Sequence, residues 1–330
     1  MSGAERARAG RARDVFSPFR TRREVWVARV ASPPGELSGA RRVRCVVREG
    51  SRHRAVVLDA AEKRELLTAA LIARASRPPI VVMAETTWKV GRNPLDELAA
   101  RAGLRLLDGA HVRYCVLSSG ELESFPRTWR VDPRRVAFTP YHYTLSDAEL
   151  LLRRPGDGSI FAGGVSLRDY GPLVEAMRSI PNELTIATTG NKRWARTAPA
   201  NVIVRETTAR EYNELTAAAS VVVVPLEARG DRSAGQATYL NAMALGKAVV
   251  VTDVLGVRDY VRDGETGVIV RAGDAQQISR ALSRLLAHPA YAARLGEAAR
   301  RDVLARFGPE RYLERLLEVV DEALASPLAR

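Results

Sequence analysis

The chain has 330 residues, of which 46% are hydrophobic and 27% charged, with a formal net charge of +13. That length is enough for two domains, and the composition is ordinary for a soluble globular protein. No apolar run reaches the roughly 18–20 residues of a membrane-spanning helix, and no apolar segment follows the arginine-rich N-terminus as in a secretory signal. We therefore expect a cytoplasmic protein.

Arginine is concentrated at the start of the chain. Residues 1–60 hold 14 Arg against 6 Asp or Glu, so they carry 14 − 6 = +8 of the net charge. Two interpretations stay open: a basic head that makes a peripheral contact with an anionic membrane, or charge that simply faces solvent. Nucleic acid is not expected as a partner, because aromatic residues make up only 6% and no nucleic-acid-binding motif is present.

The first half of the chain alternates strand and helix patterns after a polar head. Residues 1–40 are rich in Arg, Pro and Gly, and we expect them to be partly disordered. The elements predicted next are strands RRVRCVVRE and RAVVLD as a hairpin around Gly50, a helix over 60–75, strand PPIVVMAE, a helix over 94–107, strand VRYCVLSS, a helix over 120–129 and a strand over 135–138. Cys45 and Cys115 fall in strand patterns and are expected to be buried and reduced.

A turn cluster, RRPGDG at 153–158, precedes a second alternation. It is predicted to begin with strand SIFAGG, a helix over 169–179, strands ELTIATTG and ANVIVRE, and a helix over 208–218. Strand SVVVVPL, a helix over 237–245, strand AVVVTD and a short strand follow. The last predicted elements are helices from 274 to about 325, broken near Pro289 and Pro309. The alternation predicts an α/β fold of two doubly wound, Rossmann-like domains with a ligand cleft between them.

One loop in the second half carries the clearest local signal. It has the sequence SAGQAT and comprises Ser233, Ala234, Gly235, Gln236, Ala237 and Thr238. Small side chains let backbone N–H groups face a ligand, and the helix that begins here favours an anion at its N-terminus. The pattern indicates a phosphate-binding loop; the alternative is an ordinary connection between a strand and a helix.

Residues 158–325 resemble the nucleotide-sugar domain of GT-B glycosyltransferases, in particular the retaining family 4 (group 1) enzymes. FAGG with RDYGPLVEAM, NVIVRETTAREYNELTAAASVVVVPL, and NAMALGKAVVVTDVLGVRDYVRDGETGVIVRAGD occur in that family's order. The resemblance implies the following organisation: a donor domain over 151–310, a reduced acceptor-side domain over 41–150, and a terminal helix over 311–330 that packs back on the N-terminal domain.

The resemblance also implies a donor site, made of Gly163, Gly164, Arg168, Val204, the SAGQAT loop and Asn241. Arg168 would contact the diphosphate and stabilise it as leaving group; alternatively it is a surface arginine at a helix start. Ser233 and Asn241 occupy the positions of the family's two glutamates. An asparagine amide can still bind hydroxyls, whereas Ser233 brings no carboxylate.

The implied activity is transfer of a sugar from a nucleoside diphosphate sugar to an acceptor hydroxyl, without metal or another cofactor, and with retention at the anomeric carbon. Two alternatives remain open. A non-catalytic nucleotide-sugar binder would explain the replaced glutamate pair, and a GT-B nucleotide-sugar epimerase would convert the donor without an acceptor.

Candidates for acceptor chemistry lie before and at the domain boundary. Glu85 ends an apolar strand and His142 lies in PYHYTL, so either is a candidate general base. Thr86, Thr87 and Trp88 follow Glu85 and would bind the acceptor, with the Trp88 ring stacked on a sugar; alternatively they form a helix-capping loop, and His142 is structural. We expect the acceptor to be a lipid-linked glycan or a natural-product aglycone.

Overall fold

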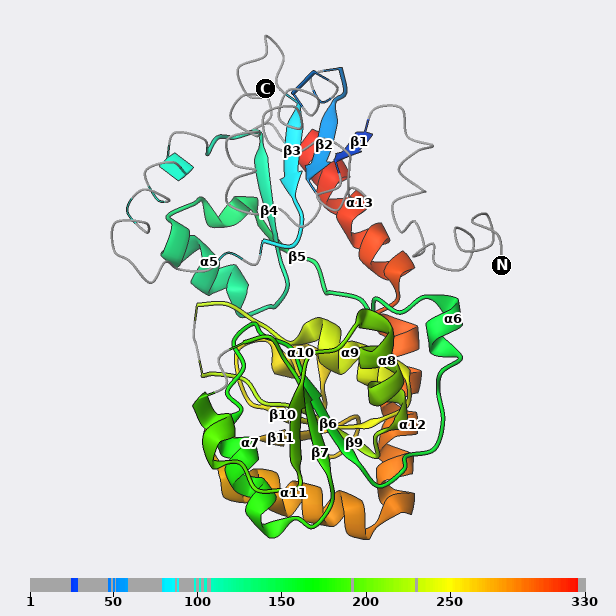
Figure 1. The fold of residues 1–330 in the computed structure, drawn as a ribbon. Coiled ribbons are helices and arrows are strands. Elements are labelled where there is room, and N and C mark those ends of the chain that lie inside the picture. Colours follow the sequence, from blue (N-terminus) through cyan, green and yellow to red (C-terminus); the bar gives the residue numbers. More distant parts are fainter. Residues whose placement is uncertain are drawn as a thin grey trace, which may run out of the picture. The chain divides into compact units, whose positions relative to one another are not determined.

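The computed structural model describes residues 25–28 (backbone only), 47–48, 50, 52–58, 79–86, 88, 98, 101, 104–105, 108–190, 193–228 and 231–325. These residues fall into two compact units. The C-terminal unit is Tyr141–Pro309, and the N-terminal unit is Asp14–Pro140 together with Glu310–Arg330. Each unit contains its own parallel sheet (Figure 1).

The N-terminal unit contains a five-stranded sheet in the order β1-β2-β3-β4-β5, in which every neighbouring pair is parallel. The strands are β1 (Val25–Ala28), β2 (Ala55–Leu58), β3 (Ile80–Met83), β4 (Val112–Val116) and β5 (Val136–Phe138). The helices are α5 (Glu121–Trp129), η2 (Pro133–Arg135) and α13 (Pro309–Ala325). Successive strand residues face opposite sides of the sheet. Val56 packs with Phe125 of α5, whereas Val57 packs with Leu316 of α13.

One prediction for this half is wrong. The hairpin around Gly50 does not form, since β2 pairs in parallel with both β1 and β3, and Val47, Arg48 and Gly50 are helical. The strand β1, within residues 1–40, was not predicted. The predicted helix over 60–75 and Cys45 lie outside the described residues, whereas Cys115 is buried in β4, where burial raises the pKa of its thiol to about 12.

The C-terminal unit contains a six-stranded parallel sheet in the order β11-β10-β9-β6-β7-β8. Its strands are β6 (Ile160–Gly163), β7 (Leu184–Ala187), β8 (Val202–Arg205), β9 (Val221–Val224), β10 (Ala248–Thr252) and β11 (Val268–Val270). Chain order runs from β6 towards β8 on one side and from β9 towards β11 on the other. The strand order therefore reverses between β6 and β9, which is where open α/β sheets bind ligands.

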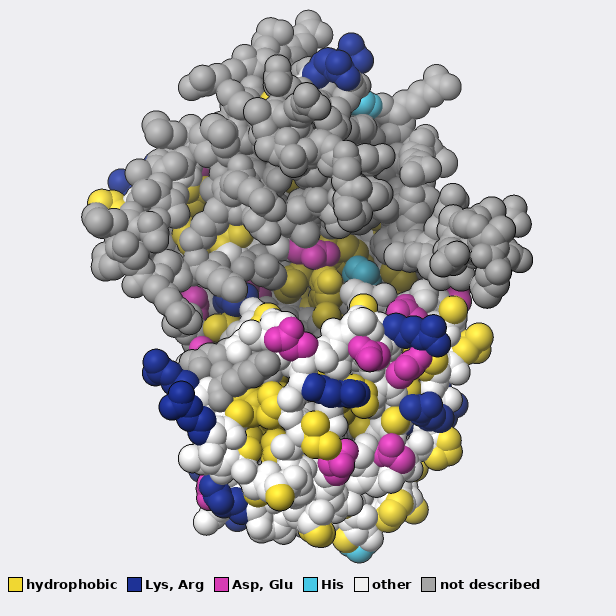
Figure 2. All heavy atoms as spheres, viewed as in Figure 1, with side chains coloured by type: hydrophobic (Ala, Val, Ile, Leu, Met, Phe, Trp, Pro, Cys, Tyr) yellow, Lys and Arg dark blue, Asp and Glu magenta, His cyan; other side chains and the backbone are white. Residues whose placement is uncertain are grey.

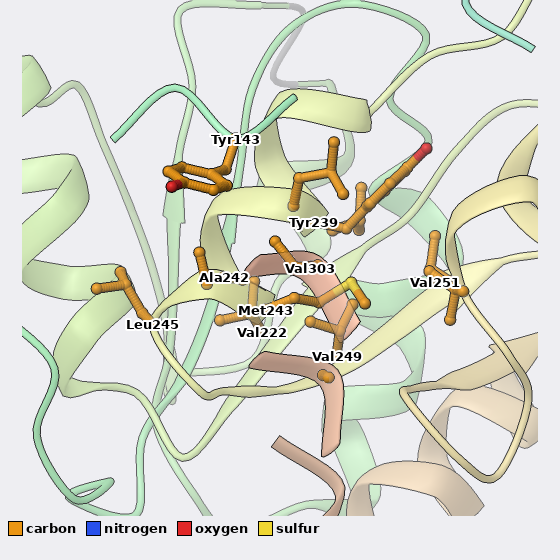
Figure 3. Close-up of a cluster of buried hydrophobic side chains, with 14 of the residues drawn as sticks. Tyr143, Val222, Tyr239, Ala242, Met243, Leu245, Val249, Val251 and Val303 are labelled. Atoms are coloured by element: carbon orange, nitrogen blue, oxygen red, sulfur yellow. The ribbon is translucent and has the colours of Figure 1, made fainter. Parts of the chain in front are cut away.

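Helices cover both faces of this sheet. They are α6 (Asp147–Leu150), α7 (Gly171–Ala176), η3 (Met177–Ser179), η4 (Arg193–Thr197), α8 (Ala209–Ala218), α9 (Gln236–Ala244), α10 (Val257–Tyr260), α11 (Ala275–Ala287) and α12 (Pro289–Arg306). Val222 and its neighbours pack with Met243 of α9 and Val303 of α12 (Figure 3). Val221 faces the other side, where Leu173 of α7 and Leu282 of α11 pack.

The surface of the C-terminal unit mixes both signs of charge. In the lower part of Figure 2, Lys and Arg side chains are interspersed with Asp and Glu rather than gathered in one patch. The arginine-rich residues 1–24 lie outside the described residues. Within the described residues, none of the helices has both the length and the apolar character needed to cross a membrane.

Candidate functional site

The loops that follow β6 and β9 meet where the strand order reverses. Arg168 and Leu226 form an isolated antiparallel bridge. The amide of Asp169 donates to Pro225 O (3.2 Å), and the amide of Glu227 donates to Leu167 O (3.0 Å). These bonds hold the two loops side by side at the carboxyl edge of the sheet.

Gly164 shapes the first loop. Its φ is +105°, a conformation that favours glycine, and its carbonyl accepts hydrogen bonds from Tyr170 Oη (2.8 Å) and Thr188 Oγ1 (3.0 Å). A Cβ at Gly164 would lie 2.8 Å from Arg168 Nη2. A Cβ at Gly163 would lie 2.3 Å from the Tyr212 ring. Both glycines are therefore needed for close packing, and Gly164 lets Arg168 lie across the loop.

Among the described residues, the Arg168 guanidinium donates to three uncharged oxygens. Nε donates to Gly163 O (2.9 Å), Nη1 to Ser166 O (2.8 Å) and Nη2 to Thr238 Oγ1 (2.9 Å). Within the described residues, no carboxylate forms an ion pair with it. Burial is the largest effect on the pKa of Arg168 and lowers it, so the cation is held in a poorly solvated place. An anionic ligand would supply the missing counter-charge.

The SAGQAT loop leads into α9. Gly235 is the N-cap residue with φ +88°, and no side chain caps this helix end in the described structure. Ser233 is 2% exposed and its Oγ accepts a hydrogen bond from Gln236 Nε2 at 2.6 Å. Ala234 is buried, and Ala237 and Thr238 lie half-buried in the first turn of α9. The positive end of α9 therefore lies beside Arg168, through the bond to Thr238.

A second arginine, Arg232, was missed by the sequence analysis. It is 6% exposed, and its Nη2 donates to Ser166 Oγ at 2.9 Å. Arg168 donates to the main-chain oxygen of the same serine. Two guanidinium groups from different loops therefore meet at Ser166. The signal that could have identified Arg232 is its position directly before the small-residue loop.

Two further predicted donor residues, Asn241 and Val204, are half-buried. Asn241, on α9, exchanges hydrogen bonds with Thr144: its Oδ1 accepts from the Thr144 amide (2.8 Å), and its Nδ2 donates to Thr144 Oγ1 (2.9 Å). Val204 is half-buried in β8, the edge strand of the sheet. The amide of Asn241 thus ties α9 to the segment that opens the C-terminal unit.

Glu85 and the residues after it belong to the N-terminal unit. Glu85 follows β3 with φ +54°, and its Oε1 accepts a hydrogen bond from Tyr312 Oη of α13 at 3.3 Å. Thr86 is 2% exposed, and both its amide (3.0 Å) and its hydroxyl (2.9 Å) donate to Cys115 O. Thr86 therefore joins β3 to β4, which is a structural position. Thr87 lies outside the described residues.

Trp88 is part of the hydrophobic core. It is 4% exposed and its ring lies 5.4–5.8 Å from the rings of Tyr114, Phe125 and Trp129. A ring enclosed by three others has no face to offer to a sugar, so we assign Trp88 to the core rather than to the acceptor.

His142 lies in the C-terminal unit and is 8% exposed. Its Nδ1 is 2.7 Å from Tyr143 O, and because a carbonyl oxygen only accepts, Nδ1 carries the hydrogen. The Tyr143 amide donates to Phe307 O, which fixes this segment on the end of α12. Across the described residues, no group of three or more His, Cys, Asp or Glu is placed to hold a metal ion.

Comparison with known proteins identifies the C-terminal unit. Residues 160–288 match the family model described as glycosyl transferases group 1. The lipopolysaccharide core biosynthesis mannosyltransferase LpcC of Rhizobium leguminosarum is 42% identical over 87 residues, 26% of this chain and 25% of that protein. The GDP-mannose-dependent phosphatidylinositol monomannoside mannosyltransferase of Mycolicibacterium smegmatis is 31% identical over 155 residues, 46% of this chain and 36% of that protein. The chain thus spans about a quarter to a third of these relatives.

Solved structures resemble most of the chain in fold. Anabaena HepE in complex with UDP-glucose has a TM-score of 0.66 at 14% identity, over 88% of this chain and 84% of that chain. The lipopolysaccharide glycosyltransferase WaaG has a TM-score of 0.59 at 14% identity, over 90% of this chain and 99% of that chain. The chain therefore has the α/β fold of the GT-B glycosyltransferases, and its residues 160–288 match the family model of group 1 glycosyl transferases.

Proposed function

We propose that this protein transfers a sugar from a nucleoside diphosphate sugar to an acceptor hydroxyl. The observation that carries the proposal is Arg168. Its guanidinium is half-buried, has no carboxylate partner among the described residues, and lies beside the positive end of α9 where the strand order reverses. A diphosphate matches this arrangement, since it brings negative charge and several acceptor oxygens.

The same groups would lower the barrier to transfer. As the bond from the anomeric carbon to the diphosphate oxygen breaks, negative charge grows on the leaving diphosphate. Arg168, Arg232 and the first-turn N–H groups of α9 are already oriented and need little rearrangement to stabilise that charge. We propose that they do so without a metal ion, and that the new glycosidic bond keeps the anomeric configuration of the donor.

The acceptor hydroxyl must lose a proton during transfer. Glu85 and His142 remain our candidates for the general base, and the leaving diphosphate itself is the third route. The Glu85 carboxylate is half-buried and accepts a hydrogen bond from Tyr312 Oη at 3.3 Å. A carboxylate can act as a general base when it lies within hydrogen-bond reach of the substrate hydroxyl.

The names of the relatives suggest donors and acceptors. HepE was solved with UDP-glucose, and the mycobacterial relative is named for GDP-mannose and a phosphatidylinositol mannoside. LpcC is named for the lipopolysaccharide core. We propose a UDP- or GDP-sugar as donor and a lipid-linked glycan as acceptor, with a natural-product aglycone as the alternative. A cytoplasmic protein with peripheral membrane contact through the arginine-rich N-terminal residues fits such an acceptor.

A second candidate function has its own support. Ser233 and Asn241, which replace the family's glutamate pair, are hydrogen-bonded to Gln236 and Thr144 inside the unit. A site with neither carboxylate suits a nucleotide-sugar binder that does not catalyse transfer. A nucleotide-sugar epimerase is a further alternative, which would change the donor without an acceptor.

Turnover measurements separate these functions. The purified chain is incubated with UDP-glucose, GDP-mannose and related donors in the presence of EDTA and a panel of lipid-linked acceptors, and nucleoside diphosphate and products are quantified by mass spectrometry. A transferase releases diphosphate and increases the acceptor mass by one sugar. An epimerase yields a new donor isomer without acceptor, and a binder yields neither. The same assay is run on Arg168→Gln. Its matched control is Arg210→Gln, because Arg210 is exposed and paired with Glu214 on α8.

A further inference from the structure

A separate cavity lies in the N-terminal unit along the edge strand β5. Its volume is about 570 Å³, within the range of small-molecule sites. Leu122 of α5 and Val319 of α13 lie on its wall with Phe138 of β5. None of its lining residues belongs to the Arg168 site, which is in the other unit.

The polar lining of this cavity is strongly basic, with the four arginines Arg113, Arg134, Arg135 and Arg315 against one acid, Glu322. Three of these arginines have carboxylate partners. Arg135 pairs with Asp108 in a largely buried bridge, and Arg134 pairs with Asp132 at 2.8 Å. Arg315 pairs with Glu318 at 2.8 Å and with Glu322 at 3.4 Å.

Arg113 differs from the other three. It is 7% exposed, and its Nη1 donates to two main-chain carbonyls, Ala110 O at 2.7 Å and Val112 O at 3.0 Å. No described carboxylate forms an ion pair with it. Burial and the neighbouring Arg135 lower the pKa of Arg113, while Asp132 raises it. Among the described residues, this buried charge therefore has no direct carboxylate partner, and an anion in the cavity would supply one.

The rest of the lining is apolar. Leu122 is 40% exposed although it is a large hydrophobic residue, Phe138 is half-buried, and Pro140 lies beside it. Next to the Arg113 guanidinium, these side chains form a surface that can contact hydrocarbon. The cavity thus combines a site for a charged group with a site for an apolar group.

We propose that this cavity binds the phosphate group of an amphipathic molecule. Arg113 pairs with a phosphate oxygen, Arg134 and Arg315 surround the remaining oxygens, and Leu122 and Phe138 contact the apolar part. Phosphate fits better than carboxylate because its three or four oxygens can accept from several guanidinium groups at once. The same chemistry is offered by a lipid headgroup and by a free organic phosphate.

The test uses decyl phosphate as the probe, titrated calorimetrically into the full chain with saturating nucleoside diphosphate present to occupy the Arg168 site. We expect saturable binding, at least tenfold weaker in Arg113→Gln. Leu122→Glu places a carboxylate at the cavity rim without disturbing the core, so it tests the site even if Arg113→Gln does not fold, and it should weaken binding similarly. Arg127→Gln, an exposed arginine of α5 paired with Glu123, should bind like the wild type.

Two further arms distinguish the source of the phosphate. If inorganic phosphate competes with decyl phosphate, the site accepts free phosphates. If the protein instead binds vesicles of phosphatidylcholine with phosphatidic acid, and does not bind pure phosphatidylcholine vesicles, the ligand is a lipid headgroup. Both results support the proposal. Equal binding of decyl phosphate by the wild type, Arg113→Gln and Leu122→Glu, or the absence of saturable binding to the wild type, would overturn it.

Discussion

Arg168 Nη2 donates a hydrogen bond to Thr238 Oγ1 at 2.9 Å, joining residues 70 positions apart in the chain. Arg168 follows β6, and Thr238 lies in the first turn of the helix that follows β9. The bond therefore spans the reversal of strand order and brings a cation and a helix N-terminus to one place. The site depends on Gly164, over which the arginine lies.

The first prediction concerns Gly164→Ala. A Cβ there would lie 2.8 Å from Arg168 Nη2, at a φ of +105°, so we expect the guanidinium to be displaced and nucleoside diphosphate affinity to fall about tenfold (about 1.4 kcal/mol). Gly273→Ala is the matched control, because φ is +75° there and nothing lies within 4 Å of the added carbon. Calorimetric titration of both variants checks this; equal affinities would show that the position of Arg168 does not matter.

The second prediction is that Arg168 and Arg232 act together through Ser166. Replacing either by Gln should weaken diphosphate binding, and the double variant should lose less than the sum of the two single losses. We expect a coupling free energy of about 0.5–3 kcal/mol, as is usual for residues within one hydrogen-bond network. A double-mutant cycle on the dissociation constants measures it. Strict additivity would mean that the two cations bind independently or that only one contacts the ligand.

The C-terminal unit was largely predictable because its signals are local. AVVVTD is a continuous apolar strand and became β10, while Gly308-Pro309 marked the break before α13. Thr208 and Glu211 show the capping-box spacing that starts α8 in the structure. Gly235 was identified from its small-residue loop, whereas Gly163 and Gly164 were identified from the family resemblance. In the structure Gly164 and Gly235 have positive φ, and Gly163 packs against Tyr212.

Other features depended on partners far away in the chain. The rings that pack against Trp88 come from residues 114–129. The sequence around Trp88 therefore could not show whether its ring packs in the core or stacks on a sugar. Asn241 bonds to Thr144, 97 positions earlier. The pairing of β2 with β1 was equally hidden, since an apolar strand near a glycine fits a hairpin as well as a parallel sheet.

The third prediction tests the place of Trp88. Removing a ring packed against three others should lower the free energy of unfolding by about 3–5 kcal/mol in Trp88→Ala. Urea denaturation measures this, with Trp194→Ala as a comparison because Trp194 is half-buried at the edge of the C-terminal unit. If the free energy of unfolding fell by less than about 1 kcal/mol and acceptor affinity fell instead, Trp88 would belong to the acceptor site.

The fourth prediction concerns pH and Lys247, which is 4% exposed and donates to Arg154 O at 2.8 Å. Burial lowers the pKa of Lys247 from 10.5 to about 8, with Asp157 opposing the change. Between these values the unfolded chain holds more protons than the folded one, so the contribution of Lys247 to stability rises with pH across this window. We expect this contribution to the free energy of unfolding to increase by on the order of 2 kcal/mol across the window.

The check is urea denaturation of the wild type and Lys247→Gln at pH 7.5, 8.5 and 9.5. The difference between the two free energies of unfolding should grow in favour of the wild type as pH rises, because only the wild type has this lysine to deprotonate. A difference that stays constant with pH would mean that Lys247 keeps an ordinary pKa.

The most direct test of the central claim is a thermal-shift screen with UDP, GDP, ADP and dTDP, and their common sugars, in the presence of EDTA. A ligand that binds only the folded state raises the melting temperature by mass action. We expect one nucleoside diphosphate to raise the melting temperature of the wild type and of Arg210→Gln by several degrees, and to leave that of Arg168→Gln unchanged. An equal shift in Arg168→Gln, or no shift with any nucleotide at millimolar concentration, would contradict the assignment of Arg168 as the centre of the donor site.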